Sequence, residues 1–193
     1  EYSSITLPAR RGDIMDSKGT PLAVSEKIYN LVIDSKVIMG KEAYFEPTMK
    51  ALESCFDLDM TAIRQYVKNN STSAYYVPLK ALTYEEIEAF VELKNDTKNN
   101  PNIAGVWFEE EYTRTYPNGS LACDVIGFTN KDNNGAYGLE EYYNDVLNGT
   151  AGREYGYLNE DSTLERTTKA AVDGYSIIST IDANVQSIIE KHL

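Results

Sequence analysis

Three charged residues that lie far apart in the chain restrict its folding more than any other feature. Arg11, Arg114 and Glu140 each lie in a short segment flanked by apolar residues. A charge in apolar surroundings is tolerated only when it is paired and hydrogen-bonded. The sequence therefore predicts that Glu140 accepts hydrogen bonds from at least one of the two arginines, which would join three distant segments. The alternative is three independent surface charges.

The composition is typical of a folded protein. Of 193 residues, 42% are hydrophobic and 25% are charged, and no apolar run approaches the roughly 18 residues that a membrane helix needs. Acidic residues outnumber basic ones by 30 to 18, which gives a net charge of −12. Because such a chain repels phosphate backbones and has no cluster of basic residues, we expect no nucleic-acid partner.

The sulfur and nitrogen ligands that zinc prefers are too few for a site. Cys55 and Cys123 lie outside any Cys-x-x-Cys spacing, and the only histidine, His192, lies next to the last residue. We therefore expect no metal and no cofactor. Both cysteines occur in helix-like segments, where a cysteine is most often a small apolar filler, and a disulfide between them is the alternative.

Hydrophobic periodicity predicts an α+β fold. Strands are expected at residues 28–34, 75–79, 103–112 and 175–181, and helices at 46–56, from about 60, from about 83, at 139–147 and from 183 to the end. Asp59 and Asp182 are expected N-caps, and Thr83 with Glu86 has the form of a capping box. Pro47 is expected in the first turn of its helix, where proline is tolerated.

No set of residues indicates an active site. The sequence contains no Ser-x-x-Lys, no Ser-x-Asn and no Lys-Thr-Gly, so the serine chemistry that uses these motifs is excluded. Glu109, Glu110 and Glu111 follow Trp107 and could suggest a glycosidase, but consecutive residues of a strand alternate between its faces and cannot converge on one bond.

The aromatic residues are mostly tyrosine, with 15 tyrosines against 5 phenylalanines and 1 tryptophan. Tyrosine offers contact area at a low cost in rotamer entropy. Tyr142, Tyr143, Tyr155 and Tyr157 are therefore a possible partner surface. A free-standing secreted module that binds glycans or proteins, through Trp107, Tyr112 and these tyrosines, is one interpretation of the chain.

Four motifs in a fixed order support a different interpretation. They are residues 9–23 with Arg11-Gly12, Asp16 and Gly19; residues 114–128 with Arg114, Tyr116, Pro117, Gly119 and Gly127; residues 138–152 with Gly138, Glu140, Tyr143, Gly149 and Gly152; and residues 173–186 with Gly174, Asp182 and Gln186. Together they resemble the N-terminal pedestal, or dimerization domain, of class B penicillin-binding proteins. The chain departs from the family pattern at Ser17-Lys18, where Arg-Asn is usual, and at Glu141, where lysine is common.

The resemblance implies a non-catalytic module. It implies an elongated pedestal in which residues 1–36 and 104–193 form a base and residues 37–103 form an inserted, mainly helical head. The motif residues would then have structural roles, and the serine nucleophile would belong to a transpeptidase domain that follows this chain.

The family also implies a location and partners. A single membrane anchor would precede Glu1 and place the chain on the extracytoplasmic face of the bacterial cytoplasmic membrane. The expected partners are the protein's own downstream transpeptidase domain, a membrane-embedded lipid II polymerase, and cell-wall or division proteins. No residue demonstrates a homodimer, although the family's traditional name asserts one.

Overall fold

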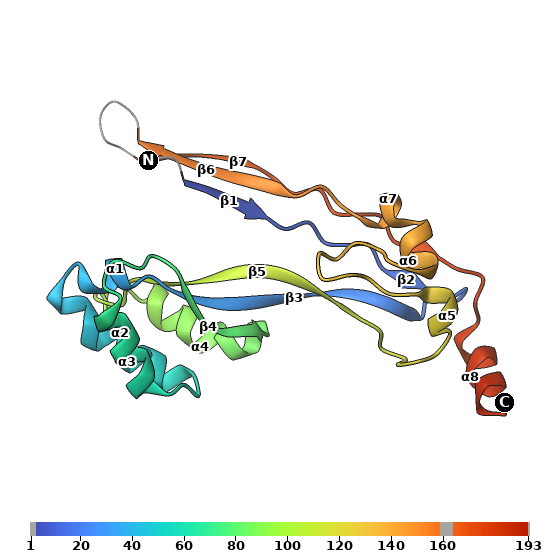
Figure 1. Cartoon of the computed structure of the whole chain (residues 1–193), viewed down its shortest axis with the longest axis horizontal. Coiled ribbons are helices and arrows are strands. Elements are labelled where there is room, and N and C mark those ends of the chain that lie inside the picture. Colours follow the sequence, from blue (N-terminus) through green and yellow to red (C-terminus); the bar gives the residue numbers. More distant parts are fainter. Residues whose placement is uncertain (1–2, 159–163, 193) are drawn as a thin grey trace. The chain divides into compact units, whose positions relative to one another are not determined.

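The computed structural model describes residues 3–158 and 164–192, and side chains within 5–155 and 167–192. The chain divides into two compact units, Glu1–Glu26 with Tyr112–Leu193, and Lys27–Glu111. Both contain helices and strands (Figure 1), so the predicted α+β class is confirmed. The assignment of residues 1–36 with 104–193 to a base and 37–103 to a head stays a prediction.

The unit Lys27–Glu111 packs helices against a small antiparallel sheet. Its strand β4 (Tyr76–Leu82) pairs with the second half of β3 (Pro21–Ile33), with Leu31 opposite Leu79 and Ile33 opposite Tyr76. The strand β5 (Val106–Thr115) also pairs with β3. The helices are α1 (Ser35–Met39), α2 (Glu42–Cys55), α3 (Met60–Asn69) and α4 (Tyr84–Asn95).

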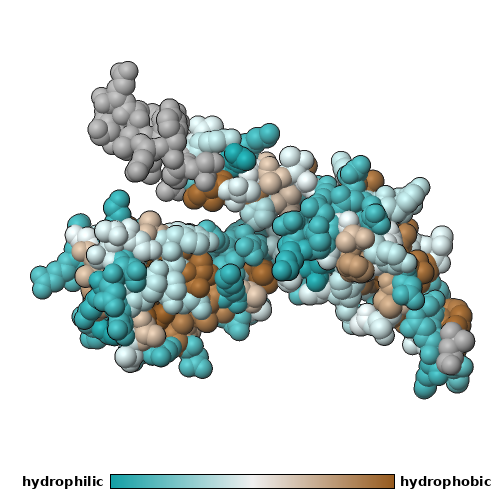
Figure 2. Space-filling view, in the orientation of Figure 1, coloured by the Kyte–Doolittle hydropathy of each residue, from teal (hydrophilic) through white to brown (hydrophobic). Residues whose placement is uncertain are grey.

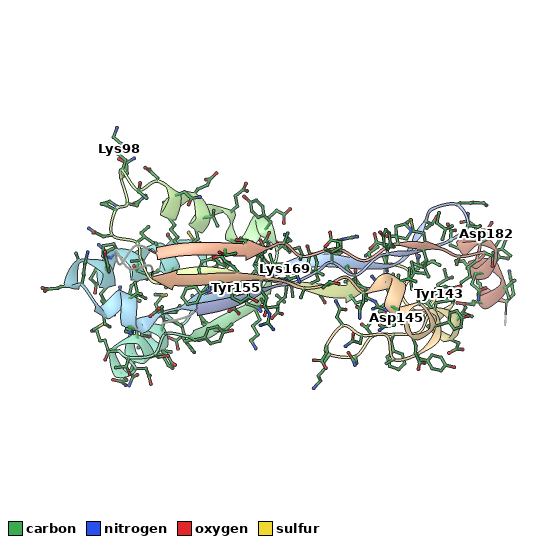
Figure 3. All side chains as sticks on the ribbon, turned by 90° about the horizontal axis from the view of Figure 1, so that it is seen from above. Lys98, Tyr143, Asp145, Tyr155, Lys169 and Asp182 are labelled. Carbon is green, nitrogen blue, oxygen red and sulfur yellow. The ribbon has the colours of Figure 1, made fainter. Side chains whose placement is uncertain are left out.

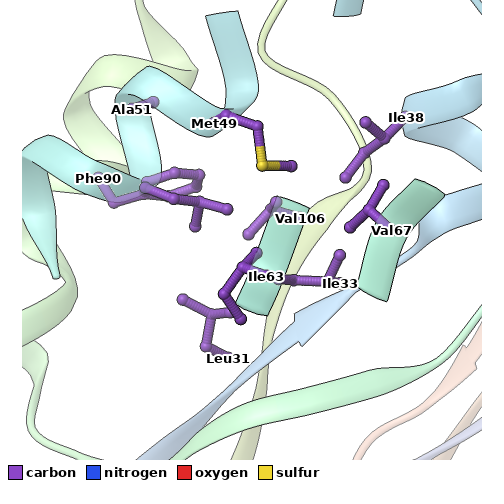
Figure 4. Packing of buried hydrophobic residues seen from close by; sticks show 10 residues of the cluster. Leu31, Ile33, Ile38, Met49, Ala51, Ile63, Val67, Phe90 and Val106 are labelled. Carbon is purple, nitrogen blue, oxygen red and sulfur yellow. The ribbon is translucent and has the colours of Figure 1, made fainter. Parts of the chain in front are cut away.

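One hydrophobic core holds this unit together. Figure 4 shows side chains from the sheet and from all four helices converging, with Phe90 of α4 near Met49 of α2. The helices expected at 46–56, from about 60 and from about 83 supply Met49, Leu52, Ile63, Val67 and Phe90, each at most 3% exposed. Burial of this apolar surface is the main force that stabilises the unit.

The predicted helix starts are confirmed in two places. Asp59 accepts a hydrogen bond from the Ala62 N–H at 3.0 Å. Thr83 and Glu86 form the reciprocal capping box, in which Thr83 Oγ1 accepts from the Glu86 N–H and Glu86 Oε2 accepts from the Thr83 N–H. The local sequence therefore determines where α3 and α4 begin.

The predicted position of Pro47 is wrong. α2 begins at Glu42, earlier than the expected 46, so Pro47 lies inside the helix beyond its first turn. Proline there removes one backbone hydrogen bond, which is unfavourable in isolation. The surrounding residues Met49, Ala51 and Leu52 are buried, and their packing stabilises the helix despite the proline.

The unit Glu1–Glu26 with Tyr112–Leu193 contains two groups of strands. One sheet has the antiparallel order β1 (Ser3–Leu7), β6 (Gly152–Leu158) and β7 (Leu164–Lys169). Elsewhere the short strand β2 (Ile14–Met15) pairs antiparallel with the first part of β3 and parallel with β8 (Ile177–Ile178). The helices are α5 (Cys123–Ile126), α6 (Gly138–Tyr142), α7 (Asn144–Leu147) and α8 (Ala183–Lys191).

A separate core lies among these elements. Its buried members are Ile14, Leu22, Ala23, Ala122, Ile126 and Leu147. They come from β2, β3, the region of α5, and α7, which are segments far apart in the sequence. Each unit therefore has a hydrophobic core of its own.

Two predictions for this unit need correction, and three of its strands were missed. The expected helix 139–147 is interrupted at Tyr143, whose ψ of 20° is not helical. The expected strand 175–181 is reduced to Ile177–Ile178, because its partner β2 is equally short. The strands β1, β6 and β7 were not predicted. β7 is almost entirely polar and β6 contains Gly156, whereas the alternation of Ser4-Ile5-Thr6-Leu7 in β1 was overlooked.

Neither cysteine forms a disulfide. Cys55 is half-buried beside the core of its unit, as expected for an apolar filler, but Cys123 is exposed at the start of α5 and does not fill a core. Within the described ranges, every helix is too short or too polar to cross a lipid bilayer.

The capping box gives a direct test of local helix stabilisation. Thr83→Ala should lower the free energy of unfolding by about 1 kcal/mol, because the Glu86 N–H loses its acceptor. Thr83→Ser is the matched control and should retain most of the stability. Urea denaturation of both variants measures the difference, and equal stability of Thr83→Ala and the parent would contradict the assigned role.

Candidate functional site

The most distinctive chemical feature of the structure is a carboxylate in the interior. Glu140 lies in α6, and its side chain is 0% exposed. Arg11, just before β2, and Arg114, near the end of β5, flank it with side chains 1% and 3% exposed. The sequence prediction that Glu140 binds at least one of the two arginines is confirmed, because it binds both.

Arg11 uses all three of its side-chain nitrogens. Nε donates to Glu140 Oε2 at 2.9 Å, and Nη2 donates to the Glu140 carbonyl at 2.8 Å. Nη1 donates to the side-chain oxygens of Asn144 and Asn148 at 2.9 and 2.8 Å, and to the Asn133 carbonyl at 3.3 Å. A guanidinium presents several donors in a planar fork, so this single side chain fixes α6, α7 and the preceding loop.

Arg114 binds the other oxygen of the same carboxylate. Its Nε donates to Glu140 Oε1 at 2.7 Å, and its Nη1 donates to the Gly12 carbonyl at 2.8 Å and to Ser25 Oγ at 2.9 Å. Its Nη2 is buried and has no hydrogen-bond partner among the described residues. Arg114 thus connects β5 to the segment before β2 and to β3.

Tyr116 completes the shell of the carboxylate. Its hydroxyl donates to Glu140 Oε1 at 3.2 Å. Burial, together with the negative charge of Glu140, raises the pKa of the Tyr116 hydroxyl, which keeps the proton needed for this donation. The cluster formed by Arg11, Arg114, Tyr116 and Glu140, called the arginine–glutamate cluster below, joins segments from three of the four sequence motifs.

Some members of the hydrogen-bond network were missed from sequence. Asn144 and Asn148 follow Glu140 at successive intervals of four residues, the spacing of one helix face, and this signal could have identified them. The interruption at Tyr143 places Asn144 so that its Oδ1 accepts from both Arg11 and the Gly135 N–H. Ser25 has no such signal in its local sequence.

A second polar site fixes the first motif to the last. Asp16 is 1% exposed and accepts hydrogen bonds from the N–H groups of Lys18, Thr20 and Ala183. Burial alone would raise the pKa of Asp16, but these backbone donors outweigh it and the pKa is lowered. Asp182, the N-cap of α8, forms an ion pair of 2.7 Å with Lys18, and this hydrogen bond lowers its pKa.

The motif glycines lie where a side chain does not fit or where the backbone needs positive φ. A Cβ on Gly12 would overlap the Tyr175 carbonyl, and one on Gly127 would overlap the Tyr137 carbonyl. Gly19 and Gly119 instead have φ of 85° and 60° with open space around them, a conformation that glycine adopts at low cost. Backbone atoms crowd the remaining motif glycines, which are Gly138, Gly149, Gly152 and Gly174.

The other motif residues lie in turns and at α8. Pro117 lies in the turn closed by the Gly119 N–H and the Tyr116 carbonyl, 3.0 Å apart. Gln186 donates to Glu190 Oε1, which also accepts from the Ala122 N–H beside α5. These contacts are structural and include no reactive group.

The four tyrosines singled out from sequence do not lie on one element. Tyr142 and Tyr143 are 81% and 37% exposed and form an edge-to-face pair with centroids 4.8 Å apart. Tyr155 lies on β6 and is 39% exposed, and Figure 3 shows it well separated from Tyr143. The side chain of Tyr157 lies outside the described residues.

The acidic run on β5 behaves as strand geometry requires. Glu109 accepts a hydrogen bond from the Tyr75 hydroxyl at 2.7 Å, whereas Glu110 binds Lys27 at 3.0 Å. The hydrogen bond to Glu109 raises the pKa of Tyr75 to about 12. These adjacent carboxylates therefore have different partners, and among the described residues no three His, Cys, Asp or Glu side chains gather as a metal site.

Comparison with known proteins gives the family. The family model for the penicillin-binding protein dimerisation domain matches residues 6–178. The chain is 29% identical over 191 residues to the peptidoglycan D,D-transpeptidase FtsI of Buchnera aphidicola and 28% identical over 214 residues to MrdA of Escherichia coli. The two matches cover 93% and 98% of this chain, but only 31% and 32% of the length of the two relatives.

Solved structures agree on the fold. Penicillin-binding protein 2X from Streptococcus thermophilus gives a TM-score of 0.77 at 23% identity, over 98% of this chain and 31% of that one. A complex between a penicillin-binding protein and MreC from Helicobacter pylori gives a TM-score of 0.63 at 16% identity. This match covers 99% of this chain and 38% of that one. The chain belongs to the penicillin-binding protein dimerisation domain family, as its four motifs indicated, and it spans about a third of the curated relatives it matches.

Removing the buried negative charge tests the arginine–glutamate cluster. Glu140→Gln should lower the free energy of unfolding by about 3 to 5 kcal/mol, because two buried guanidinium groups lose their counterion. Chemical denaturation followed by circular dichroism measures this loss.

The matched control is Glu46→Gln. This variant removes the same charge from the ion pair between Glu46 and Arg64, in which the Glu46 side chain is 58% exposed. An exposed ion pair contributes little to stability. We expect a much smaller loss from Glu46→Gln. Equal losses in the two variants would show that burial of Glu140 has no energetic consequence.

The lowered pKa values of Asp16 and Asp182 predict how stability changes with acidity. A carboxyl group with a lowered pKa in the folded state binds protons more readily when unfolded, so its contribution is complete above its ordinary pKa of 3.8 and is lost as pH falls below it. The free energy of unfolding should therefore fall between about pH 5 and pH 2.

Asp16→Asn should make that fall less steep and reduce stability near neutral pH. The exposed Asp57→Asn is the control and should leave both the slope and the neutral stability close to those of the parent. Urea titrations at several pH values measure the slopes, and an unchanged slope in Asp16→Asn would contradict the assignment.

Proposed function

We propose that this chain is the non-catalytic extracytoplasmic pedestal of a class B penicillin-binding protein, which positions a downstream D,D-transpeptidase domain for peptidoglycan cross-linking. The observation that carries the proposal is the match of residues 6–178 to the dimerisation domain, combined with relatives that are named D,D-transpeptidases and are about three times as long. The missing Ser-x-x-Lys, Ser-x-Asn and Lys-Thr-Gly motifs agree with a supporting role for these residues.

The arginine–glutamate cluster suits a support. Its buried charges hold α6, β5 and the segment before β2 in one arrangement, and separating any of them would leave a charge unpaired in the interior. A rigid module can hold an attached domain at a defined position, and a contact on its surface can be transmitted as a reorientation of that domain. Rigidity here comes from buried polar contacts in addition to the hydrophobic core.

The proposed partners follow from the family and from one structural neighbour. The Helicobacter pylori neighbour is a penicillin-binding protein in complex with MreC, which supports the proposal that the parent of this chain also binds a partner protein. We extend this to a membrane-embedded lipid II polymerase and to division proteins. Tyr142, Tyr143 and Tyr155 are exposed candidates for contact residues. A membrane anchor preceding Glu1 would place this chain at the extracytoplasmic face of the cytoplasmic membrane, within reach of these partners.

Labelling with a fluorescent penicillin tests the transpeptidase half of the proposal. The 193-residue chain should not be acylated, because it has no serine–lysine pair of the required spacing. The protein extended beyond Leu193 through its next domain should be labelled, and excess unlabelled penicillin should prevent this. Gel fluorescence measures both results.

Labelling of the 193-residue chain itself would overturn its non-catalytic role. A failure of the extended protein to label would overturn the transpeptidase half and favour a free-standing binding module. For the positioning role, an extended protein with Glu140→Gln should retain labelling at a temperature where it stays folded, yet support less peptidoglycan cross-linking in cells than Glu46→Gln does.

A further inference from the structure

A hollow of about 340 Å³ opens beside α5, in the unit that contains the arginine–glutamate cluster. Its lining is mainly apolar and includes Tyr116, Leu121, Ile126, Phe128 and Tyr137. This hollow is called the α5 hollow below. Figure 2 shows hydrophobic surface among hydrophilic residues in the region of α5 and α6. Ligand pockets in proteins measure about 300 to 1,000 Å³, so the α5 hollow can admit a side chain of another protein or a small molecule.

Hydrogen bonds fix the walls of the α5 hollow. The Ala136 N–H donates to the Phe128 carbonyl at 2.9 Å, which joins the two arms of the loop that carries the aromatic lining. The Tyr116 hydroxyl donates to Glu140, so the ring of Tyr116 is held by the arginine–glutamate cluster. Walls that are fixed before binding reduce the entropy that is lost when a guest enters.

Two aromatic rings of the α5 hollow have much of their surface in water. Phe128 and Tyr137 are 56% and 53% exposed. The rings stack with their centroids 6.1 Å apart and their planes 21° from parallel. Exposed apolar surface that gathers in one place marks an interaction site, unlike single scattered residues. The face of an aromatic ring carries a partial negative charge and attracts a cation.

The charges at the α5 hollow are negative. Among the described residues that line it, Asp124 is the only charged one. The Asp124 side chain is exposed, accepts only a weak contact from Cys123 Sγ at 3.9 Å, and forms no ion pair within the described part of the chain. Glu190 accepts from the Ala122 N–H and places a second carboxylate at the start of α5. With a net charge of −12 on the whole chain, a positively charged guest is favoured.

We propose that the α5 hollow receives an arginine side chain of a partner protein, with Asp124 as its counterion and Phe128 and Tyr137 as its aromatic walls. A guanidinium group is planar and weakly hydrated, so it stacks on aromatic rings while it donates to a carboxylate. Lysine carries its charge on a strongly hydrated ammonium group and suits such a site less well. This proposal goes beyond the pedestal role, because binding of an arginine does not depend on which domain follows Leu193.

A nuclear magnetic resonance titration of the 193-residue chain tests the site with two probes. N-acetylarginine amide carries the guanidinium group, whereas N-acetylcitrulline amide carries a neutral urea group of nearly the same shape. The methyl signals of Ile126, which lines the hollow, report binding. The arginine probe should bind about fivefold more tightly, because it alone interacts with the carboxylate and the rings as a cation. Equal binding of the two probes, or no binding of the arginine probe, would overturn the proposal.

Two pairs of variants identify the groups that bind the arginine probe. Asp124→Asn should remove the preference for arginine over citrulline, whereas Asp57→Asn, which removes another exposed charge, should retain it. Phe128→Leu should weaken arginine binding by about threefold. Tyr175→Leu removes a 79% exposed ring outside the hollow and should leave binding unchanged. All four side chains are exposed, so each variant should fold. If the members of a pair behave alike, the α5 hollow is not the arginine site.

The same titration of the protein extended beyond Leu193 identifies the occupant. The Ile126 methyl signals should respond to the arginine probe as they do in the 193-residue chain, because a partner protein needs an accessible site. Loss of the response would show that the protein's own following domain covers the hollow and would overturn the proposal. Penicillin labelling of the extended protein tests the proposed function separately, so the two proposals can fail independently.

Discussion

The buried carboxylate of Glu140 is the constraint on which the arrangement of its unit depends. Two guanidinium groups, from Arg11 and Arg114, share its two oxygens, and each also binds backbone carbonyls or polar side chains of other segments. Desolvating three charges is costly, and this cost is offset only when the charges meet in a single geometry. Unlike the non-directional packing of the hydrophobic core, the hydrogen bonds of this cluster require a defined arrangement of the segments that carry Arg11, Arg114 and Glu140.

The cluster also explains why the motifs contain glycine beside charge. Gly12 supplies the carbonyl that Arg114 binds, and its backbone passes so close to Tyr175 that a side chain would not fit. The first motif reaches the last one by a second route, through Asp16 and the N–H of Ala183. Each motif is therefore one part of a contact completed by another, which accounts for their wide spacing. The polar contacts between motifs therefore add to the stability that the hydrophobic core provides.

By itself, the sequence determined the features that depend on neighbouring residues or on the requirement that buried charges be paired. It predicted the caps at Asp59, Thr83 and Asp182, the presence of the helices α3 and α4, the α+β class, and the contact of Glu140 with arginine. Only the tertiary structure decided the interruption at Tyr143, the helical position of Pro47, and the pairing of β1, β6 and β7. These depend on contacts with distant segments, such as Arg11 with Asn144, whose packing and hydrogen bonds outweigh local preference.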